Sequence, residues 1–408
     1  MTQPAPPLGT DDPVIGGLPD AGVEIESTAA LEAALAAGVA PARLRLQDLD
    51  LTDFRGFDAR TDLDQMVVLG GRLSPTLEAH VRTHGAIVFP DDPQAAPIRP
   101  YRSQLYTADE LFAGLAQGYW ATPDARAYAW YQRDRRRPDV FTALLQAIHD
   151  DSIADALEEF VDGTPVVGVM GGHALARGTA AYADAARLGL HLAAQGFIVA
   201  TGGGPGAMEA ANLGAAAPDS AALGRALDVL AQVPTFADVT AWAQCGLAAR
   251  ASLTQGHAPV ERVQGKSAPG RRAQGGSLGI PTWFYGHEPP NVFGDGIAKY
   301  FSNALREDRL LALADAGVVI LPGAAGTVQE IFQVATRAYY ATESPPPMVL
   351  VGRDHWTSTI PVWPALIALG DGRPMGQRLA LVDDIDSALD HLVLDPRALD
   401  RRALDHGP

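Results

Sequence analysis

Short, continuous apolar runs recur through the second half of the chain, and helical patterns separate most of them. The runs are "PVVGVM" (165–170), "FIVA" (197–200), "GIPTWFY" (279–285), "AGVVIL" (316–321) and "MVLVG" (348–352). Strands that are apolar on both faces and are connected through helices form a parallel sheet that is covered on both sides. The pattern therefore predicts an α/β fold built on a doubly wound parallel sheet. Ligands of such sheets bind where strands end and loops lead into helices.

The first half of the chain has a different pattern. Residues 1–25 are rich in Pro, Gly and Asp, and we expect them to form a mobile tail. The regular elements after them are two predicted strands at 64–71 and 85–92, a helix between these, and a mainly helical stretch at 107–163. We therefore expect a smaller N-terminal α/β domain over residues 26–163. Every candidate catalytic residue lies after 164, so this domain is expected to regulate the protein or to build a homo-oligomer, a dimer or higher.

Composition argues against several classes of partner. The formal net charge of -17 repels phosphate backbones, so we expect no nucleic-acid polymer as a partner. No apolar run is long enough to span a bilayer, and the N-terminus lacks the features of a signal peptide, so we expect no membrane partner. The single cysteine, Cys245, fits a reducing cytoplasm. Histidines are scattered without metal-binding spacing, so no metal site is predicted.

Lysine is rare in this chain, and this bears on cofactors. Lys266 and Lys299 are the only lysines, and neither directly follows a predicted core strand. Pyridoxal phosphate requires a lysine for its Schiff base, held rigidly beside the ring. We therefore expect no cofactor of this kind.

Two glycine-rich turns lead from predicted strands directly into predicted helices, in "GGGPGAMEAAN" (202–212) and "PGAAGTVQE" (322–330). Glycine lets the backbone approach a ligand closely, and the amides at a helix start attract an anion. The candidate substrate-binding residues at these turns are Gly203, Gly204, Gly206, Gly323, Gly326 and Thr327, and the last three are expected to hold a phosphate. Close strand-to-helix packing is the alternative explanation for Gly202.

Glu330 lies three positions after Thr327, so both residues share one helix face. A phosphate at the helix start would place a ribose about one turn further along, near this carboxylate. The alternative is a capping-box role for the two side chains.

These signatures resemble those of the LOG family, enzymes that are often labelled lysine decarboxylases and that cleave the bond between base and ribose 5-phosphate. The second family signature is Pro-Gly-Gly-x-Gly-Thr-x-x-Glu. The chain keeps Pro322, Gly323, Gly326, Thr327 and Glu330, and it has Ala324 where the family has its second glycine. The resemblance implies a Rossmann-like catalytic domain over residues 164–408, without a cofactor.

Three motifs, "GGHALARG", "GPGAMEA" and "EPPN", are similar to those of the bacterial purine/pyrimidine-nucleotide 5′-monophosphate nucleosidases. By its position before "ADAG", Arg306 corresponds to the arginine that the family places opposite the glutamate, and Arg309 is the alternative. The further pocket candidates are His173, Met208, Asn212 and Asn291. For His173 and Met208 a purely structural role is the alternative.

The resemblance implies hydrolysis of the N-glycosidic bond of nucleoside 5′-monophosphates, with release of free base and ribose 5-phosphate. Arg306 and Glu330 would be the catalytic residues. The alternative is a non-catalytic protein that binds or carries a nucleotide or a phosphorylated cofactor on the same fold. An insertion at about 215–278 is long for this family and, with Ala324, keeps the binding-protein alternative open. Its basic, Gly-rich second half is expected to be either a surface loop or a lid.

Overall fold

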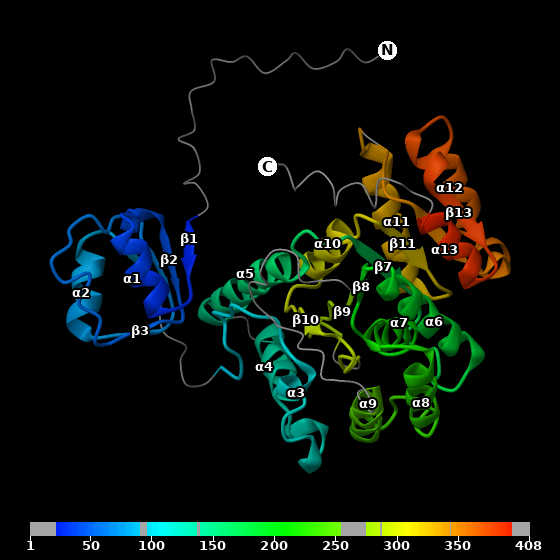
Figure 1. The fold of residues 1–408 in the computed structure, drawn as a ribbon, viewed down its shortest axis with the longest axis horizontal. Helices are drawn as coiled ribbons and strands as arrows, with labels where there is room; N and C mark the ends of the chain where they lie inside the picture. The colour runs from blue at the N-terminus through cyan, green and yellow to red at the C-terminus, as the bar shows by residue number, and fades with distance from the viewer. Residues whose placement is uncertain are drawn as a thin grey trace. The chain divides into compact units, whose positions relative to one another are not determined.

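A computed structural model describes residues 22–89, 96–136, 139–253, 275–285, 288–342 and 344–393. The chain forms two compact units, Met1–Ser103 and Gln104–Pro408 (Figure 1). The division differs from the boundary that the sequence suggested at residues 163 and 164. Each unit is described by itself.

The first unit contains a parallel sheet in the order β1-β2-β4-β6 and a two-stranded pair, β3-β5. Its elements are β1 (Val23–Ile25), α1 (Thr28–Ala36), β2 (Leu44–Gln47), β3 (Asp50–Leu51), β4 (Val67–Leu69), β5 (Arg72–Leu73), α2 (Pro75–Thr83) and β6 (Ile87–Phe89). Ser27 and Ser74 cap the two helices by accepting hydrogen bonds from backbone amides. The predicted strands at 64–71 and 85–92 are confirmed in their central residues. The expected tail was too long, because β1 pairs with β2, and residues 1–21 lie outside the described part.

The second unit begins with helices that sequence reasoning assigned to the other domain. They are α3 (Ala108–Leu111), α4 (Pro123–Arg136) and α5 (Val140–Val161). Polar contacts attach them to the rest of this unit. Tyr106 pairs with Ile297 through two backbone hydrogen bonds of 3.0 and 2.9 Å. Asp124 on α4 accepts hydrogen bonds from Lys299 Nζ at 2.5 Å and from Trp283 Nε1 at 2.9 Å. A buried charge needs such partners, so α4 cannot leave this unit without stranding Asp124.

A seven-stranded sheet in the order β10-β9-β8-β7-β11-β12-β13 forms the centre of the second unit, and every pair in it is parallel. Its strands are β7 (Val166–Met170), β8 (Ile198–Thr201), β9 (Gly276–Gly279), β10 (Gly296–Ile297), β11 (Gly317–Ile320), β12 (Met348–Val351) and β13 (Leu379–Val382). The predicted α/β fold with a doubly wound parallel sheet is therefore confirmed. The strand predicted at 279–285 was misplaced, because Gly276–Gly279 pairs with β8 and the chain leaves the sheet after it.

Strand order dictates the layers. From β7 the chain steps outward to β8 and β9, then returns to β11 beside β7 and steps the other way. Right-handed crossovers in opposite directions place their helices on opposite faces. On one face α6 (Ala180–Ala194) packs against α7 (Ala207–Ala216) and α13 (Ile385–Val393). On the other, α10 (Asn303–Leu313) packs on β7 and on α11 (Ala325–Tyr340), which contacts α12 (Trp363–Gly370) (Figure 1).

The predicted insertion is partly helical. It contains α8 (Ser220–Leu230) and α9 (Val239–Leu253), which pack against each other, and α8 also contacts α6. Residues 254–274 lie outside the described part, and with them most of the stretch predicted to be a loop or lid, including Lys266. Shorter helical segments are η1 (Pro41–Arg43), η2 (Leu115–Gln117), η3 (Tyr119–Ala121), η4 (His355–Thr359) and η5 (Pro374–Arg378).

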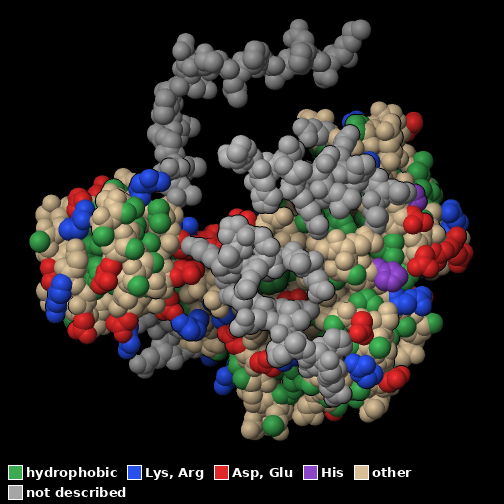
Figure 2. All heavy atoms as spheres, viewed as in Figure 1, with side chains coloured by type: hydrophobic (Ala, Val, Ile, Leu, Met, Phe, Trp, Pro, Cys, Tyr) green, Lys and Arg blue, Asp and Glu red, His purple; other side chains and the backbone are tan. Residues whose placement is uncertain are grey.

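The described part of the chain contains no helix long and apolar enough to cross a membrane. It also contains no group of three or more His, Cys, Asp or Glu side chains arranged to hold a metal ion. On the face shown in Figure 2, acidic, basic and hydrophobic side chains are interspersed.

Candidate functional site

The strand order reverses between β7 and β11, and the loops that follow these two strands meet there. The amide of Gly172 donates a hydrogen bond of 3.1 Å to the carbonyl of Pro322. A Cβ atom added at Gly172 would lie 3.3 Å from the Cα atom of Gly323. In an open α/β sheet such a reversal is where a ligand binds. The two loops therefore define the centre of the candidate site.

The glycine-rich loop after β8 packs directly on the loop after β7. Gly206 has a φ of 73°, and a Cβ atom on it would lie 2.5 Å from the Gly172 carbonyl oxygen. Gly203 has a φ of 69°, with a Cβ position only 2.7 Å from the ring of Pro281. Both positions require glycine for conformation and for close approach. Gly206 precedes α7 with no side-chain cap, so the first amides of that helix receive no cap bond from it.

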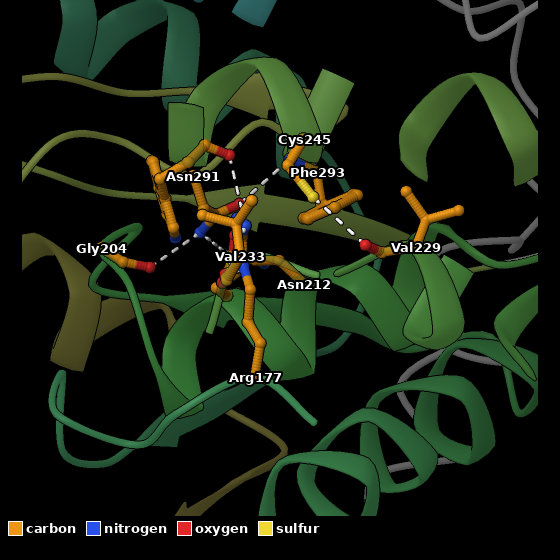
Figure 3. Close-up of polar contacts among 10 residues, drawn as sticks. Arg177, Gly204, Asn212, Val229, Val233, Cys245, Asn291 and Phe293 are labelled. Atoms are coloured by element: carbon orange, nitrogen blue, oxygen red, sulfur yellow. Dashed lines mark hydrogen bonds and ion pairs between the residues drawn. The ribbon is translucent and has the colours of Figure 1, made fainter. Parts of the chain in front are cut away.

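Asn212 and Asn291 hold the glycine-rich loop after β8 in place through hydrogen bonds. Asn212 is fully buried; its Oδ1 accepts from Thr201 Oγ1 at 2.7 Å and from Asn291 Nδ2 at 2.9 Å. The side chain of Asn291 also donates a hydrogen bond of 3.2 Å to the Gly204 carbonyl (Figure 3). The backbone amide of Asn291 donates one of 2.7 Å to the Gly203 carbonyl. Their amide groups are occupied with the backbone of β8 and its loop. We expected these side chains to line a pocket, but the structure uses them to hold the loop in place.

The first turn of α11 lies at the end of β11. Ala324 precedes the helix with a φ of -120°, a conformation open to any residue, and provides no side-chain cap. Alanine therefore costs no backbone strain where the family signature has glycine. Thr327 lies inside the helix and not at its cap, so the capping-box explanation is wrong. Gly323 is needed here, because a Cβ atom on it would lie 2.1 Å from Thr327 Oγ1.

His355 was not predicted as a site residue. It begins the short helix after β12, and its Nε2 lies 3.0 Å from the Gly323 carbonyl oxygen. The ring therefore fixes the loop that leads into α11. Nothing in the local sequence around His355 signals this contact.

Arg306 and Glu330 form an ion pair in which Nη1 lies 3.5 Å from Oε1. Their side chains are only 9% and 13% exposed, so the pair is shielded from water. Burial raises the pKa of Glu330 to about 7; Arg306 opposes this shift, and the charges of Glu307 and Glu288 add to it. Nε of Arg306 is buried without a hydrogen-bond partner. Arg309 instead pairs with Glu158 on exposed surface, which removes it as the alternative.

Glu307 and Asp150 position the helices that carry this pair. Glu307 on α10 accepts hydrogen bonds from Gln329 Nε2 at 2.7 Å and Gln333 Nε2 at 2.9 Å, both on α11. Asp150 on α5 accepts from the amides of Phe301 at 2.9 Å and Ser302 at 2.8 Å, at the start of α10. A buried carboxylate at this helix end is stabilised by the helix dipole. Neither residue was predicted from the sequence.

His173 and Glu288 form a second pair, with Nδ1 of the ring 2.9 Å from Oε1 of the carboxylate. Glu288 is 19% exposed and His173 is 46% exposed. A Cβ atom added at Gly204 would lie 3.7 Å from Glu288 Oε2 and 2.9 Å from Cε of Met208. Met208 itself is buried, and a Cβ atom on Gly202 would meet both its sulfur and the guanidinium of Arg306. These residues connect the two ion pairs across the loop after β8.

Known protein families cover most of the second unit. Residues 164–252 match the model described as the SLOG cluster4 family. Residues 265–391 match the model described as "possible lysine decarboxylase". Comparison with curated proteins gives no significant match.

Two solved structures resemble the chain at low sequence identity. One is a molybdenum cofactor binding protein from the phototrophic bacterium Rippkaea orientalis, with 16% identity, 56% of this chain and 94% of that chain covered, and a TM-score of 0.33. The other is TM1055, a structural genomics target, with 17% identity, coverage of 55% and 96%, and a TM-score of 0.32.

Proposed function

Because the chain belongs to the LOG family of lysine decarboxylase-like proteins, we propose that it hydrolyses the N-glycosidic bond of nucleoside 5′-monophosphates. The products are free base and ribose 5-phosphate. The observation that carries the proposal is the shielded Arg306–Glu330 pair beside the glycine-rich loop after β8. A carboxylate with a pKa of about 7 can exchange a proton with a reactant near neutral pH.

The start of α11 would hold the 5′-phosphate. Gly323, Gly326 and Thr327 lie there, no side chain caps the helix, and the helix dipole favours a negative charge at this end. With the phosphate at the first turn, the ribose would extend along the helix toward Glu330. At Gly326 a Cβ atom would meet nothing within 4 Å, so this side of the turn is open, which supports the proposal.

Glu330 would act at C1′. As the C1′–N bond breaks, its electron pair leaves with the base and positive charge develops on the sugar, as in other glycoside hydrolyses. A carboxylate near C1′ stabilises this charge more in the transition state than in the ground state. The attacking water bonds to C1′ and transfers a proton to Glu330. Arg306 holds the carboxylate in place through the 3.5 Å contact.

Incubation with AMP, GMP, CMP and UMP, with detection of free base, tests the proposal. Glu330→Gln should lower base release by about a hundredfold or more, the scale of losing one strong electrostatic contribution. Nucleotide binding, measured by calorimetry, should persist in this variant because the phosphate site is unchanged. Glu159→Gln, which removes an exposed carboxylate on α5, is the matched control and should keep full activity.

Two results would contradict the proposal. Normal turnover by Glu330→Gln would show that this carboxylate has no part in the chemistry. Binding of all four nucleotides without any release of base would favour the alternative, a nucleotide-binding protein that is not an enzyme.

A further inference from the structure

The segment from Val233 to Trp242, which connects α8 to α9 and includes the first turn of α9, is fixed to the loop after β7. Arg177 accounts for the attachment. Its amide donates to the Pro234 carbonyl at 3.0 Å, and its Nη1 donates to the carbonyls of Val233 at 3.4 Å and Trp242 at 3.2 Å. Figure 3 shows this arginine directed toward Val233. The segment belongs to the insertion, so part of the insertion packs against the loop after β7, beside the candidate site.

Arg177 is itself held by a buried carboxylate. Nε and Nη2 of the guanidinium contact Glu209 on α7 at 2.9 and 2.5 Å, and both side chains are 1% exposed. The guanidinium also lies 4.8 Å from the ring centroid of Trp242. A bidentate pair of this kind fixes geometry as well as charge. The segment is therefore positioned rigidly relative to α7 and its glycine loop.

Phe236 lies in the middle of this segment and contacts His173. The two ring centroids are 6.2 Å apart at an interplanar angle of 81°, and Phe236 also contacts Trp242 at 6.4 Å. Both Phe236 and His173 are partly exposed. His173 contacts Glu288, whose charge reaches Glu330 and contributes to raising its pKa. A series of interactions therefore links Glu330 to Glu288 through charge, Glu288 to His173 through an ion pair, and His173 to the ring of Phe236.

We propose that Phe236 and the His173–Glu288 pair form the nucleobase side of the site. Phe236 contacts the base, and His173, oriented by Glu288, protonates the departing base. This inference rests on the proposed function. Partly exposed aromatic rings bind planar bases well, and aromatic contacts with bases are tolerant of base identity. A histidine held by a carboxylate has a fixed ring orientation, as a proton donor requires.

The proposed step balances as follows. The C1′–N bond breaks and its electron pair passes to the base nitrogen, which takes a proton from Nε2 of His173. Water bonds to C1′ and gives its proton to Glu330. Exchange with solvent then returns the proton from Glu330 and restores the one on His173. No oxidant, reductant or metal ion takes part.

Two substrates separate the roles of these residues. AMP needs its leaving base to be protonated, whereas the nitrophenolate of 4-nitrophenyl β-D-ribofuranoside 5-phosphate departs without a proton. His173→Gln should lower kcat for AMP by about a hundredfold and should change kcat for the nitrophenyl substrate by less than about threefold. Glu330→Gln should slow both substrates, because both pass through the same charged sugar.

Phe236→Ala should raise the KM for AMP by about tenfold, the scale of one lost base–aromatic contact, with little change in kcat. Phe236→Tyr should restore the wild-type KM. The inhibition constant of ribose 5-phosphate, which has no base, should be the same in all three proteins. That constancy also shows that the variants are folded.

Each failure has its own signature. Equal losses on both substrates in His173→Gln, or an unchanged KM for AMP in Phe236→Ala, would overturn the inference while the proposed function stands. If the wild-type protein cleaves neither substrate and releases no base from GMP, CMP or UMP, the proposed function itself is overturned.

Discussion

Glu330→Gln should make the protein less sensitive to pH as well as less active. In the folded chain Glu330 keeps its proton up to a pH of about 7, whereas its ordinary pKa is 4.5. Between these values the folded state binds more protons than the unfolded state, so stability falls as pH rises. The stabilising contribution of the protonated carboxyl is complete below about pH 4.5 and is lost as pH rises through about 7. Glutamine does not titrate and removes this dependence.

The size of the effect follows from the two pKa values. A difference between about 7 and 4.5 corresponds to about 3 kcal/mol in the free energy of unfolding. Of this, about 2.5 kcal/mol should be lost between about pH 5 and about pH 8. The wild type should therefore lose about that much more stability over this range than Glu330→Gln does. Removing a buried charge from a functional site in this way commonly stabilises a protein while it costs activity.

Urea unfolding followed by tryptophan fluorescence measures the effect. All six tryptophans, the first of which is Trp120, lie beyond Ser103, so the signal reports on the second unit alone. Glu159→Gln is the control, because it removes an exposed carboxylate from the same unit. If Glu330→Gln lost as much stability as the wild type between the two pH values, Glu330 would not titrate near neutrality and the reasoning from its burial would fail.

Four further predictions concern binding, the domains and cofactors. Thr327→Ala should raise the KM for nucleotides more than it lowers kcat, because Thr327 lies in the first turn of α11, where we propose that the phosphate binds. Thr336→Ala, at an exposed position of α11, should change neither. Deleting 1–103 should leave a folded fragment, since the second unit starts at Gln104. If the first unit regulates the protein or builds the oligomer, the fragment should differ from the full chain in regulation or in subunit number. A fragment unchanged in both would refute these roles. Deleting 1–163 should abolish folding, visible by circular dichroism, because it removes the carboxylates that pair with Lys299 and cap α10. The purified protein should show no pyridoxal phosphate absorbance, since Lys299 is buried against Asp124; a visible Schiff-base band would refute this.

Local sequence was sufficient for the features that depend on spacing. Glycine turns after apolar runs located the loops that follow β8 and β11, and the spacing from Thr327 placed Glu330 on the first turns of α11. The position of Arg306 before "ADAG" is consistent with its pairing to that glutamate. The sheet itself was predictable because its strands are apolar on both faces.

Other features depend on partners far along the chain, and no local pattern reveals them. β9 has the sequence "GSLG", which lacks the β-branched and aromatic residues typical of strands. Asp150 and Glu288 act through contacts with Ser302 and His173 that only the fold brings together. The domain boundary was misplaced for the same reason, since helicity alone does not say which core a helix joins.

The contacts of α4 and α5 also bear on the order in which the chain can fold. The hydrogen-bond partners of Asp150 are the amides of Phe301 and Ser302, 151 and 152 residues further along the chain. The partner of Asp124 is the ammonium group of Lys299, 175 residues further along. Closing loops of this length costs conformational entropy before the new contacts can stabilise the chain, so contacts so distant in sequence slow folding. During synthesis, α4 and α5 emerge from the ribosome long before their partners exist. The first helices of the second unit are therefore among the last parts to reach their final packing, and they need protection from aggregation until residue 302 has been made.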